Sequence, residues 1–416
     1  MTDLRALIVD RIRTSGPVSF AEYMDLALYH PSLGYYARAA RRTGRAGDFY
    51  TSVDVGPLFG ELIARQLAEM WRMLREHPLD AEPGAGRNAA GDGTVAPREI
   101  LPASVARGLE PQTPSFDLVE AGAGSGRLAY DILEAASHRD PEFYADIRLH
   151  LVERSAAARA AQQTTLGPHG ARLRSSGEAL PARVCGTILA NELLDALPTH
   201  AVIMTGDGLR EVFVDLQDDR LVERLLEPST DEIASYLARV GARLGPGWRA
   251  EVNLEAVAWV RTAARRLERG FLLLIDYGHE AADLYAASSG TLTTFRRHTT
   301  SVPGQPDLGP VAACLAHPGE CDITAHVDLT AITQAAEAEG LTTLGRLDQT
   351  YFLMGLGFAD PADTGHAPSA PDRHRSLAFK TLMFPGGLGS THKVLVFGKG
   401  VGTPRLSGCS YRMRLT

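Results

Sequence analysis

The sequence predicts an α/β fold built on a mostly parallel sheet, and three observations support this prediction. Short apolar segments alternate with helical segments between residues 116 and 190. The first apolar segment runs directly into a glycine-rich turn at residues 122–126. A further buried apolar run, at 271–276, resumes the pattern after an interruption. Parallel strands need crossover helices, so helices are expected on both faces of the sheet.

Composition is that of a globular enzyme, with 416 residues, 44% hydrophobic and 22% charged. The net charge of −8 argues against a broad nucleic-acid-binding face, but it allows an acidic pocket for a cationic substrate. The four cysteines form no CxxC pair and have no histidine at zinc spacing, so we predict a reduced compartment and no metal site. No apolar run resembles a signal peptide or a membrane span, so a soluble, cytoplasmic protein is expected.

The N-terminal part is expected to be helical. A helix is predicted over 3–13, and a second one runs from the cap Ser19, with Glu22 three residues later, to about residue 28. A loop rich in glycine and arginine follows at 34–52, then a long amphipathic helix at 55–76. Residues 78–115 read as a flexible surface insertion with no chemical role.

The remaining elements were predicted from periodicity. Strands are expected at 116–120, 147–152, 171–174, 186–190, 271–276, 341–347 and 393–397, with helices at 127–136, 155–163, 229–243, 254–268 and 328–339. A β-meander is expected over 200–226 and a long loop over 277–322. We therefore divide the chain into a helical N-terminal segment (1–77), the insertion (78–115), the first core part (116–199), an inserted α+β subdomain (200–269) and the second core part (270–416).

The glycine-rich turn is the first candidate site. Residues 120–126 read EAGAGSG, so Gly122, Gly124 and Gly126 follow Glu120 at the end of a strand. Glycines there allow a tight turn and close approach of a ligand to the backbone. The spacing is GxGxG rather than the GxGxxG of a pyrophosphate site. Loop N–H groups could instead hold the carboxylate of an aminoacyl nucleoside while Glu120 faces its amino group; a purely structural turn is the alternative.

Glu153 is the second candidate, since it ends the next predicted strand, 27 residues beyond Gly126. An acid at this place can accept hydrogen bonds from both hydroxyls of a ribose. Alternatively, it is an acid at the start of a helix, stabilised by the helix dipole.

The third candidate is residues 191–198, which read NELLDALP directly after an apolar strand. Polar groups at the carboxyl end of a parallel strand stand where open α/β sheets bind ligands. Glu192 and Asp195 are three residues apart and share one face if the segment is helical, and two carboxylates close together could hold a guanidinium. The alternative makes Asn191 a helix cap and the acids its dipole partners.

Two further segments are weaker candidates. Residues 44–52 mix small, acidic, aromatic and hydroxyl side chains without periodicity, as a ligand-facing loop or a solvated turn does. Asp276, Tyr277, Gly278 and His279 close a buried strand and could line the substrate side of a cleft. Single histidines are more often structural, so His279 is not assigned a catalytic role.

These residues, taken together, resemble the MidA-like S-adenosylmethionine-dependent methyltransferases, whose mitochondrial members are complex I assembly factors and protein arginine methyltransferases. The segments on which the resemblance rests follow the family's order over nearly the whole chain. They are YHPSLGYY at 29–36, GDFYTS at 47–52, FGE at 59–61, EAGAGSG at 120–126, LVE at 151–153, NELLDALP at 191–198, IDYG at 275–278, GTL at 290–292, DITAHVD at 322–328 and FGK at 397–399. The resemblance implies a Rossmann-like class I methyltransferase fold with a mostly parallel seven-stranded sheet.

The resemblance also implies roles for single residues. Gly122, Gly124, Gly126 and Glu153 match the family's donor loop and ribose acid. Asn191 and Glu192 match its Asn-Glu near the transferred methyl group. Gly47, Asp48 and Thr51 match an N-terminal segment expected to close over the cofactor.

The chain departs from the family pattern in four places. Leu193-Leu194 replaces an aromatic pair, Gly-Ala-Gly replaces Gly-Pro-Gly in the donor loop, Thr-Ser-Val-Asp at 51–54 replaces Thr-Ser-Pro-Glu, and the 78–115 insertion is long. These changes surround the pocket, so they bear on the acceptor more than on the cofactor.

The expected function is transfer of a methyl group from S-adenosyl-L-methionine to an arginine of a protein, such as a respiratory complex I subunit. Glu192, Asn191 and Asp195 are the expected catalytic residues, and Glu120 joins the residues that bind the cofactor. The alternatives are a small-molecule acceptor, another side chain, or a non-catalytic assembly factor; a dehydrogenase fits the glycine spacing poorly. No nucleic-acid partner is expected, and a homodimer stays open.

Overall fold

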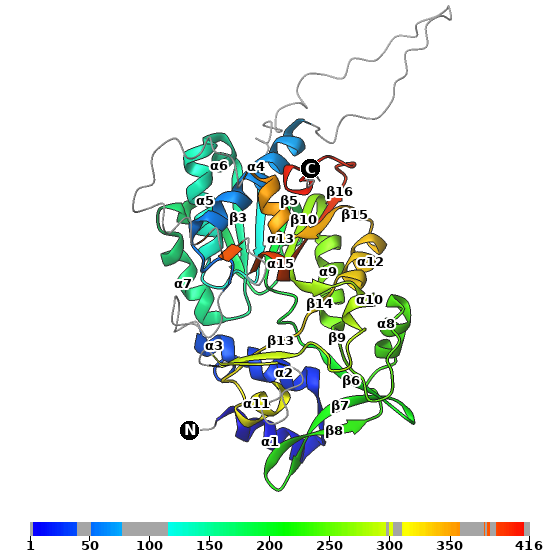
Figure 1. Cartoon of the computed structure of the whole chain (residues 1–416). Coiled ribbons are helices and arrows are strands. Elements are labelled where there is room, and N and C mark those ends of the chain that lie inside the picture. The colour runs from blue at the N-terminus through cyan, green and yellow to red at the C-terminus, as the bar shows by residue number, and fades with distance from the viewer. Residues whose placement is uncertain are drawn as a thin grey trace, which may run out of the picture.

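A computed structural model describes residues 3–39, 51–76, 115–296, 299–302, 310–357, 378, 381–382 and 388–411. The molecule is elongated and has two bodies: one holds the main sheet, and the other holds the N-terminal helices and an antiparallel sheet (Figure 1). Within the described residues, no helix is long and apolar enough to cross a membrane.

The main sheet has the strand order β15-β16-β10-β5-β2-β3-β4, and the short β14 pairs with the end of β10. Strand β16 is antiparallel to both of its neighbours, while the pairs formed by β10, β5, β2, β3 and β4 are parallel. The predicted α/β class with a mostly parallel sheet is therefore confirmed. The strands are β2 (Phe116–Ala121), β3 (Ile147–Val152), β4 (Leu173–Gly177), β5 (Val184–Asn191), β10 (Leu267–His279), β14 (Val327–Asp328), β15 (Thr342–Asp348) and β16 (His392–Lys399).

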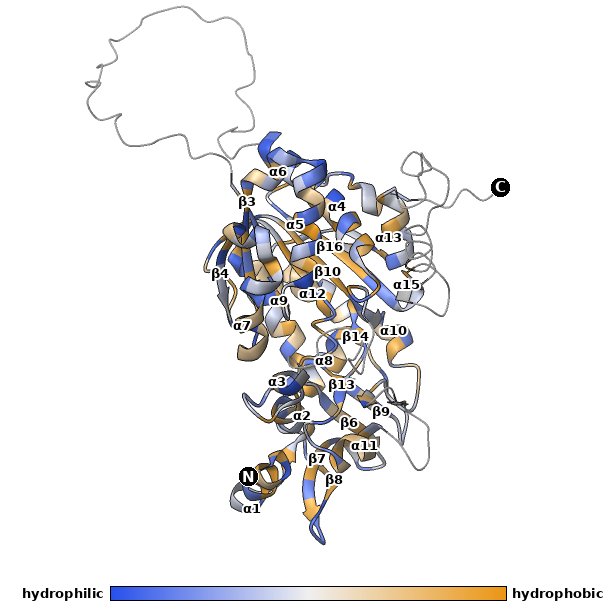
Figure 2. Cartoon of the chain, turned by 90° about the vertical axis from the view of Figure 1, so that its left-hand side faces the viewer, coloured by the Kyte–Doolittle hydropathy of each residue, from blue (hydrophilic) through white to orange (hydrophobic). Residues whose placement is uncertain are grey.

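Helices cover both faces of this sheet, because its strands are apolar on both sides. Along β10, Phe271 and Leu273 belong to one hydrophobic core, whereas Leu272 and Leu274 belong to the core on the opposite face. Helices α4 (Pro57–Glu76), α5 (Arg127–Arg139) and α7 (Ala156–Leu166) contribute to the first core, and α9 (Leu254–Arg266) and α12 (Leu329–Ala338) to the second. Figure 2 shows the apolar strands β10 and β16 enclosed by these helices.

The second body has a core of its own, made from three distant parts of the chain. Helices α1 (Leu4–Ser15) and α2 (Phe20–Tyr29) share this core with residues of the 200–226 region and of 311–325. Its larger sheet has the order β1-β7-β6-β9, with β8 also paired to β7. Strand β1 ties the N-terminus to this sheet, since Val18 pairs with Val214 of β7.

The elements of the second body are short and mostly antiparallel. Its strands are β1 (Val18–Ser19), β6 (His200–Thr205), β7 (Gly208–Gln217), β8 (Arg220–Leu226), β9 (Arg249–Val252), β11 (Thr293–Arg296), β12 (Thr299–Ser301) and β13 (Asp322–Thr324). Strands β11, β12 and β13 form a separate three-stranded sheet, which α11 (Pro310–Ala316) contacts. The predicted meander over 200–226 is confirmed as β6, β7 and β8.

Most elements that the sequence did not predict are short. The predicted loop 277–322 contains α10 (Ala281–Leu284), β11, β12 and α11, and the predicted loop 34–52 contains α3 (Tyr35–Ala39). Other short elements have no predicted counterpart: β9, α6 (Pro141–Asp146), α13 (Gln349–Gly355), α15 (Leu388–Thr391) and the 3-10 turns η1 (Gly167–Arg172) and η3 (Ser407–Cys409). Helix α8 (Glu232–Val240) lies within the helix predicted at 229–243. Elements of one or two turns carry too little periodicity to detect, and tertiary contacts stabilise them. The domain boundaries stay a prediction, and residues 77–114 lie outside the described part.

Candidate functional site

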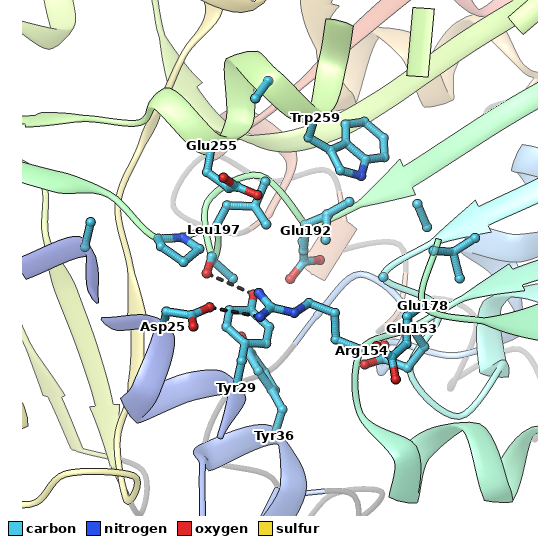
Figure 3. Close-up of a pocket in the computed structure, with 18 of the residues that line it drawn as sticks. Asp25, Tyr29, Tyr36, Glu153, Arg154, Glu178, Glu192, Leu197, Glu255 and Trp259 are labelled. Carbon is cyan, nitrogen blue, oxygen red and sulfur yellow. Dashed lines mark hydrogen bonds and ion pairs between the residues drawn. The ribbon is translucent and has the colours of Figure 1, made fainter. Parts of the chain in front are cut away.

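A cavity of about 770 Å³ lies at the carboxyl ends of β2, β3 and β5, where the second body meets the sheet. Its lining comes from α2 and α3, from the ends of β2 and β3, from the loops after β2, β3, β4 and β5, from the start of β6, and from α8 and α9. Figure 3 shows Glu192 near the middle, with Glu153 and Glu178 to one side, Glu255 and Trp259 on α9, and Asp25 and Tyr29 on α2.

The glycine loop forms one wall of this cavity. Gly122, Gly124 and Gly126 all have positive φ, at 72°, 51° and 84°. A Cβ at Gly122 would come within 3.2 Å of Leu193 Cδ1, while a Cβ at Gly124 would meet nothing within 4 Å. Gly122 and Gly124 line the cavity, whereas Gly126 lies at the N-cap of α5. The loop thus leaves open space at Gly124 that a side chain would fill.

Glu120 lies behind the glycine loop and is not among the residues that line the cavity. Its side chain is buried, with the residue 5% exposed, and Oε2 accepts a hydrogen bond from Ala129 N at 3.1 Å. Burial raises the pKa of Glu120 to about 8, although the hydrogen bond from Ala129 lowers it. The carboxyl group therefore caps the first turn of α5 from within the core.

Glu153 follows β3 directly and lines the cavity. Its Oε2 accepts a hydrogen bond from Gly124 N at 2.9 Å, and its Oε1 accepts one from Ser155 N at 2.7 Å. The carboxylate thus joins the glycine loop to the start of α7, where Ser155 is the N-cap. Both alternatives considered for Glu153 are reflected in this geometry: the acid lies at a helix start and also faces the cavity.

Glu192 is a buried carboxylate with one unsatisfied oxygen. Its side chain is 7% exposed, and its backbone has a φ of 51°. Oε1 accepts hydrogen bonds from Ser52 N at 3.1 Å and Asn191 Nδ2 at 3.3 Å, and His392 Nε2 lies 3.4 Å away. Oε2 is buried and has no hydrogen-bond partner among the described residues. Glu192 is one of the residues that line the cavity, so this unsatisfied carboxylate lies at the edge of the space where a ligand would bind.

The segment after Asn191 is not helical, so the expectation that Glu192 and Asp195 share a helix face is wrong. The backbone instead wraps around the Asp276 carboxylate, whose Oδ2 accepts hydrogen bonds from Leu193 N at 3.1 Å and Leu194 N at 2.7 Å. A buried carboxylate competes with helix formation by taking these N–H groups. The helix-cap alternative for Asn191 fails for the same reason.

Asp195 faces Asp276 rather than the cavity, and neither acid is among the lining residues. Burial raises the pKa of Asp276 to about 7, while hydrogen bonds from backbone N–H groups lower it. Burial and the neighbouring Asp276 carboxylate also raise the pKa of Asp195 well above its ordinary value. The pair therefore holds a proton near neutral pH. Asn191 likewise does not line the cavity and contacts it through Glu192.

The N-terminal segment contacts Glu192 through Ser52 rather than Thr51. Thr51 uses its N and Oγ1 to donate hydrogen bonds to Asp54 Oδ2, at 3.1 and 3.0 Å. Ser52 is fully buried, and its backbone N–H donates to Glu192. Gly47 and Asp48, which were expected to cover the cofactor, lie outside the described residues.

Several lining residues were not found from the sequence. Arg154 Nη2 donates to Asp25 Oδ1 of α2 at 2.9 Å, and its guanidinium lies 4.1 Å from the centre of the Tyr29 ring (Figure 3). His200 and Trp259 also line the cavity. Arg154 and His200 adjoin recognised motifs, since they follow Glu153 directly and the NELLDALP segment by two residues. Their position in the chain was therefore a usable signal.

The lining is strongly acidic. Six described lining residues carry carboxylates: Asp25, Glu153, Glu178, Glu192, Glu232 and Glu255. The described basic groups of the lining are Arg154, which is paired with Asp25, and His200, which contacts Glu211. Such a cavity attracts cations and repels anions.

Comparison with known proteins agrees with this geometry. A family model described as an S-adenosyl-L-methionine-dependent methyltransferase matches residues 103–347. The mitochondrial protein arginine methyltransferase NDUFAF7 of Homo sapiens is 27% identical and covers 86% of this chain and 74% of the human protein. Its homolog in Drosophila melanogaster is 26% identical over 94% of this chain and 84% of the fly protein.

A solved structure is similar over almost the whole chain. The crystal structure of a Burkholderia thailandensis protein bound to S-adenosyl-homocysteine is 28% identical, with a TM-score of 0.76, and covers 98% of this chain and 94% of that one. The family model matches more than half of the chain, and the solved relative has the same architecture with a cofactor product bound. The chain therefore belongs to this family of S-adenosyl-L-methionine-dependent methyltransferases, and S-adenosyl-L-methionine is its cofactor.

Proposed function

We propose that this methyltransferase acts on a guanidinium nitrogen of an arginine in a protein. The observation that carries the proposal is the Glu192 carboxylate, which is more than nine-tenths buried, has an unpaired Oε2 and belongs to a residue that lines an acidic cavity. A buried carboxylate oxygen without a donor is costly, and a guanidinium supplies charge-assisted N–H donors in a planar arrangement. The relatives described above that are named protein arginine methyltransferases support the same acceptor.

The donor side of the cavity is assigned to the glycine loop and Glu153. Open space at Gly124 leaves room for the donor beside the loop backbone, because no Cβ occupies it. Glu153 is assigned to the ribose hydroxyls, with Gly122 shaping the turn and Glu120 and Gly126 holding it against α5. When bound, S-adenosyl-L-methionine supplies the methyl group and departs as a neutral thioether. The roles of Gly47, Asp48 and Thr51 as a cover stay predictions.

On the acceptor side, Glu192 would hold the guanidinium and keep its positive charge away from the nitrogen that is methylated. Ser52 N–H and Asn191 fix one carboxylate oxygen, so the other keeps its direction. Asp195 would act indirectly, because its contact with Asp276 supports the backbone that carries Glu192. Burial excludes water from this contact and strengthens it.

A protein partner follows from this proposal, and a respiratory complex I subunit is the one that the family resemblance implies. The relatives named above are described as mitochondrial. The cytoplasmic location and the homodimer remain predictions.

The test is to incubate the full chain with tritiated S-adenosyl-L-methionine and an extract of the producing cell, then to separate proteins from small molecules. Label recovered as methylarginine after hydrolysis of the protein fraction is the expected result. Mass spectrometry of that fraction would identify the modified residue. Label confined to lysine or to small molecules would overturn the assignment of the acceptor.

A matched pair of variants tests the role of Glu192. Glu192→Gln should lower kcat about 100-fold while donor affinity stays within about twofold, since removal of one preorganised charged group has effects of this size. Glu142→Gln, which changes an exposed acid at the start of α6, is the control and should behave like the wild type. Unchanged kcat in Glu192→Gln would remove Glu192 from the acceptor site.

A further inference from the structure

A buried histidine–carboxylate pair lies beside the cavity, and the function proposed above does not use it. His200 begins β6 and lines the cavity, and its side chain is 17% exposed. Its Nδ1 lies 2.7 Å from Oε1 of Glu211 in β7, and Glu211 is fully buried. The other oxygen, Glu211 Oε2, accepts a hydrogen bond from Ser229 N. The carboxylate is therefore fixed from both sides.

This arrangement selects one form of the imidazole ring. Burial alone would raise the pKa of Glu211, but hydrogen bonds from His200 and Ser229 lower it below its ordinary value. An ionised Glu211 accepts, so the neutral ring carries its proton on Nδ1 and leaves the lone pair on Nε2. Among the described residues, no protein group pairs with Nε2, and the ring lines the cavity.

Methylation of a cationic nitrogen releases one proton, and this proton needs an acceptor. A bond forms between the substrate nitrogen and the methyl carbon while the bond from that carbon to sulfur breaks, and its electron pair goes to sulfur. The product keeps the single positive charge of the substrate guanidinium, so one N–H proton leaves. Glu192 is suited to holding the cation, because it is buried and because hydrogen bonds from Ser52 N and Asn191 Nδ2 fix its carboxylate.

We propose that His200, oriented by Glu211, takes this proton at Nε2 and passes it to solvent. Imidazole is the side chain best matched to proton transfer near neutral pH, and a carboxylate at Nδ1 stabilises the imidazolium that forms. The partial exposure of His200 gives the proton a way out of the cavity. The inference rests on the proposed function, since the proton balance is that of a nitrogen acceptor.

Other charged groups line the same cavity as His200. They are Asp25 and Arg154, which pair with each other, and the acids Glu153, Glu178, Glu192, Glu232 and Glu255. The pair could instead serve only to link β6 to β7, which are neighbours in one sheet. The two roles differ in kinetics, because a structural link affects binding and stability rather than proton transfer.

The experiment compares His200→Gln, Glu211→Gln and His138→Gln with the wild type. His138 is a matched control, since it forms an exposed histidine–glutamate pair within α5, with Glu134. For each protein, the binding of S-adenosyl-homocysteine is measured by calorimetry. The kcat and KM for the unmethylated acceptor protein, identified by the labelling test above, are measured from pH 6 to 9. The wild-type values over this range are the reference for the variants.

His200→Gln should lower kcat about 100-fold, the usual contribution of a general base, and should change the shape of the dependence of kcat on pH. Donor affinity and acceptor KM should stay within about twofold. Glu211→Gln should give a smaller loss of kcat, about tenfold. A His200→Gln kcat within twofold of the wild type, or a loss matched by equally weak donor binding in both variants, would overturn the inference. A wild type that methylates no nitrogen would instead overturn the proposed function, and the inference with it.

Discussion

The two sides of the cavity are built in different ways. On the donor side, the glycine loop and Glu153 belong to one βαβ unit, and the contact that joins them, Gly124 N to Glu153, spans 29 residues. On the acceptor side, Glu192 is held by Ser52 from 140 residues away, and His200 begins β6, a strand of the other sheet. A local unit thus binds the common cofactor, while the surface for the acceptor is assembled from distant segments.

Glu153 and Glu192 show the same difference at the level of single carboxylates. Both oxygens of Glu153 accept one hydrogen bond each from backbone N–H groups, so the protein fixes the direction of this carboxylate, and each oxygen keeps a lone pair for a ligand hydroxyl. Glu192 has one oxygen satisfied and one unpaired within the described structure. The protein therefore orients Glu153 through both oxygens, whereas it leaves one oxygen of Glu192 to a ligand that can donate to it.

The largest effect should come from breaking the donor side with Gly124→Val. Valine at a φ of 51° is strained, and its methyl groups would fill the open space beside Glu153. Affinity for S-adenosyl-homocysteine, measured by calorimetry, should fall at least about 100-fold, because strain and lost space add. Gly206→Val is the control: a Cβ there also meets nothing within 4 Å, but Gly206 lies between β6 and β7 and not in the cavity lining. Normal affinity in a folded Gly124→Val protein would exclude the glycine loop from the donor site.

A smaller effect, on kcat rather than on donor affinity, should come from disturbing the acceptor side with Asp276→Asn. Asparagine cannot accept on both sides, so either Tyr277 N–H or the N–H groups of Leu193 and Leu194 would lose their acceptor. The backbone carrying Glu192 would then be less well fixed, and kcat should fall about tenfold with donor affinity unchanged.

The control for this variant is Asp117→Asn. Asp117 is another buried acid of the main sheet, which pairs with Arg148 and accepts from Cys185 N, outside the cavity lining. It should lower the free energy of unfolding, measured in urea, without changing kcat per folded molecule. Equal losses of kcat in both variants would mean that Asp276 acts through stability alone.

The smallest effect concerns Glu120, which belongs to the donor side but acts in the core. Its folded pKa of about 8 lies above that of an unfolded glutamate, so the folded state binds the proton more tightly. The stability contributed by this group is present at low pH and is lost as the pH rises from about 4.5 to about 8. Glu120→Gln should remove this part of the pH dependence and keep the hydrogen bond from Ala129 N.

Urea unfolding at pH 5, 7 and 9 would measure this change. The variant should be more stable than the wild type at pH 9 by about 1 kcal/mol or more, with little difference at pH 5. A Glu120→Gln curve parallel to that of the wild type would mean that burial does not keep this carboxyl protonated.

Several elements could be predicted because their signals are local. Helix α2 begins after Ser19, whose Oγ accepts from Glu22 N as a capping box predicts, and the burial of Leu62, Leu67 and Met70 follows the periodicity of α4. The segment 191–198 could not be predicted in the same way. Its spacing permits a helix, and a carboxylate 81 residues later in the chain, Asp276, takes its N–H groups instead.

The sequence by itself determined the α/β class, the position of the glycine loop and the acid that follows the next strand, because strand–turn–helix signals lie within a few tens of residues. Tertiary structure alone decided that Glu120 faces the core, that Asp195 turns towards Asp276, and that Ser52 reaches Glu192. It also decided that His200 and Glu211 meet beside the cavity. The direction of a buried side chain depends on the packing around it and on the register of neighbouring strands, which the local sequence pattern does not encode.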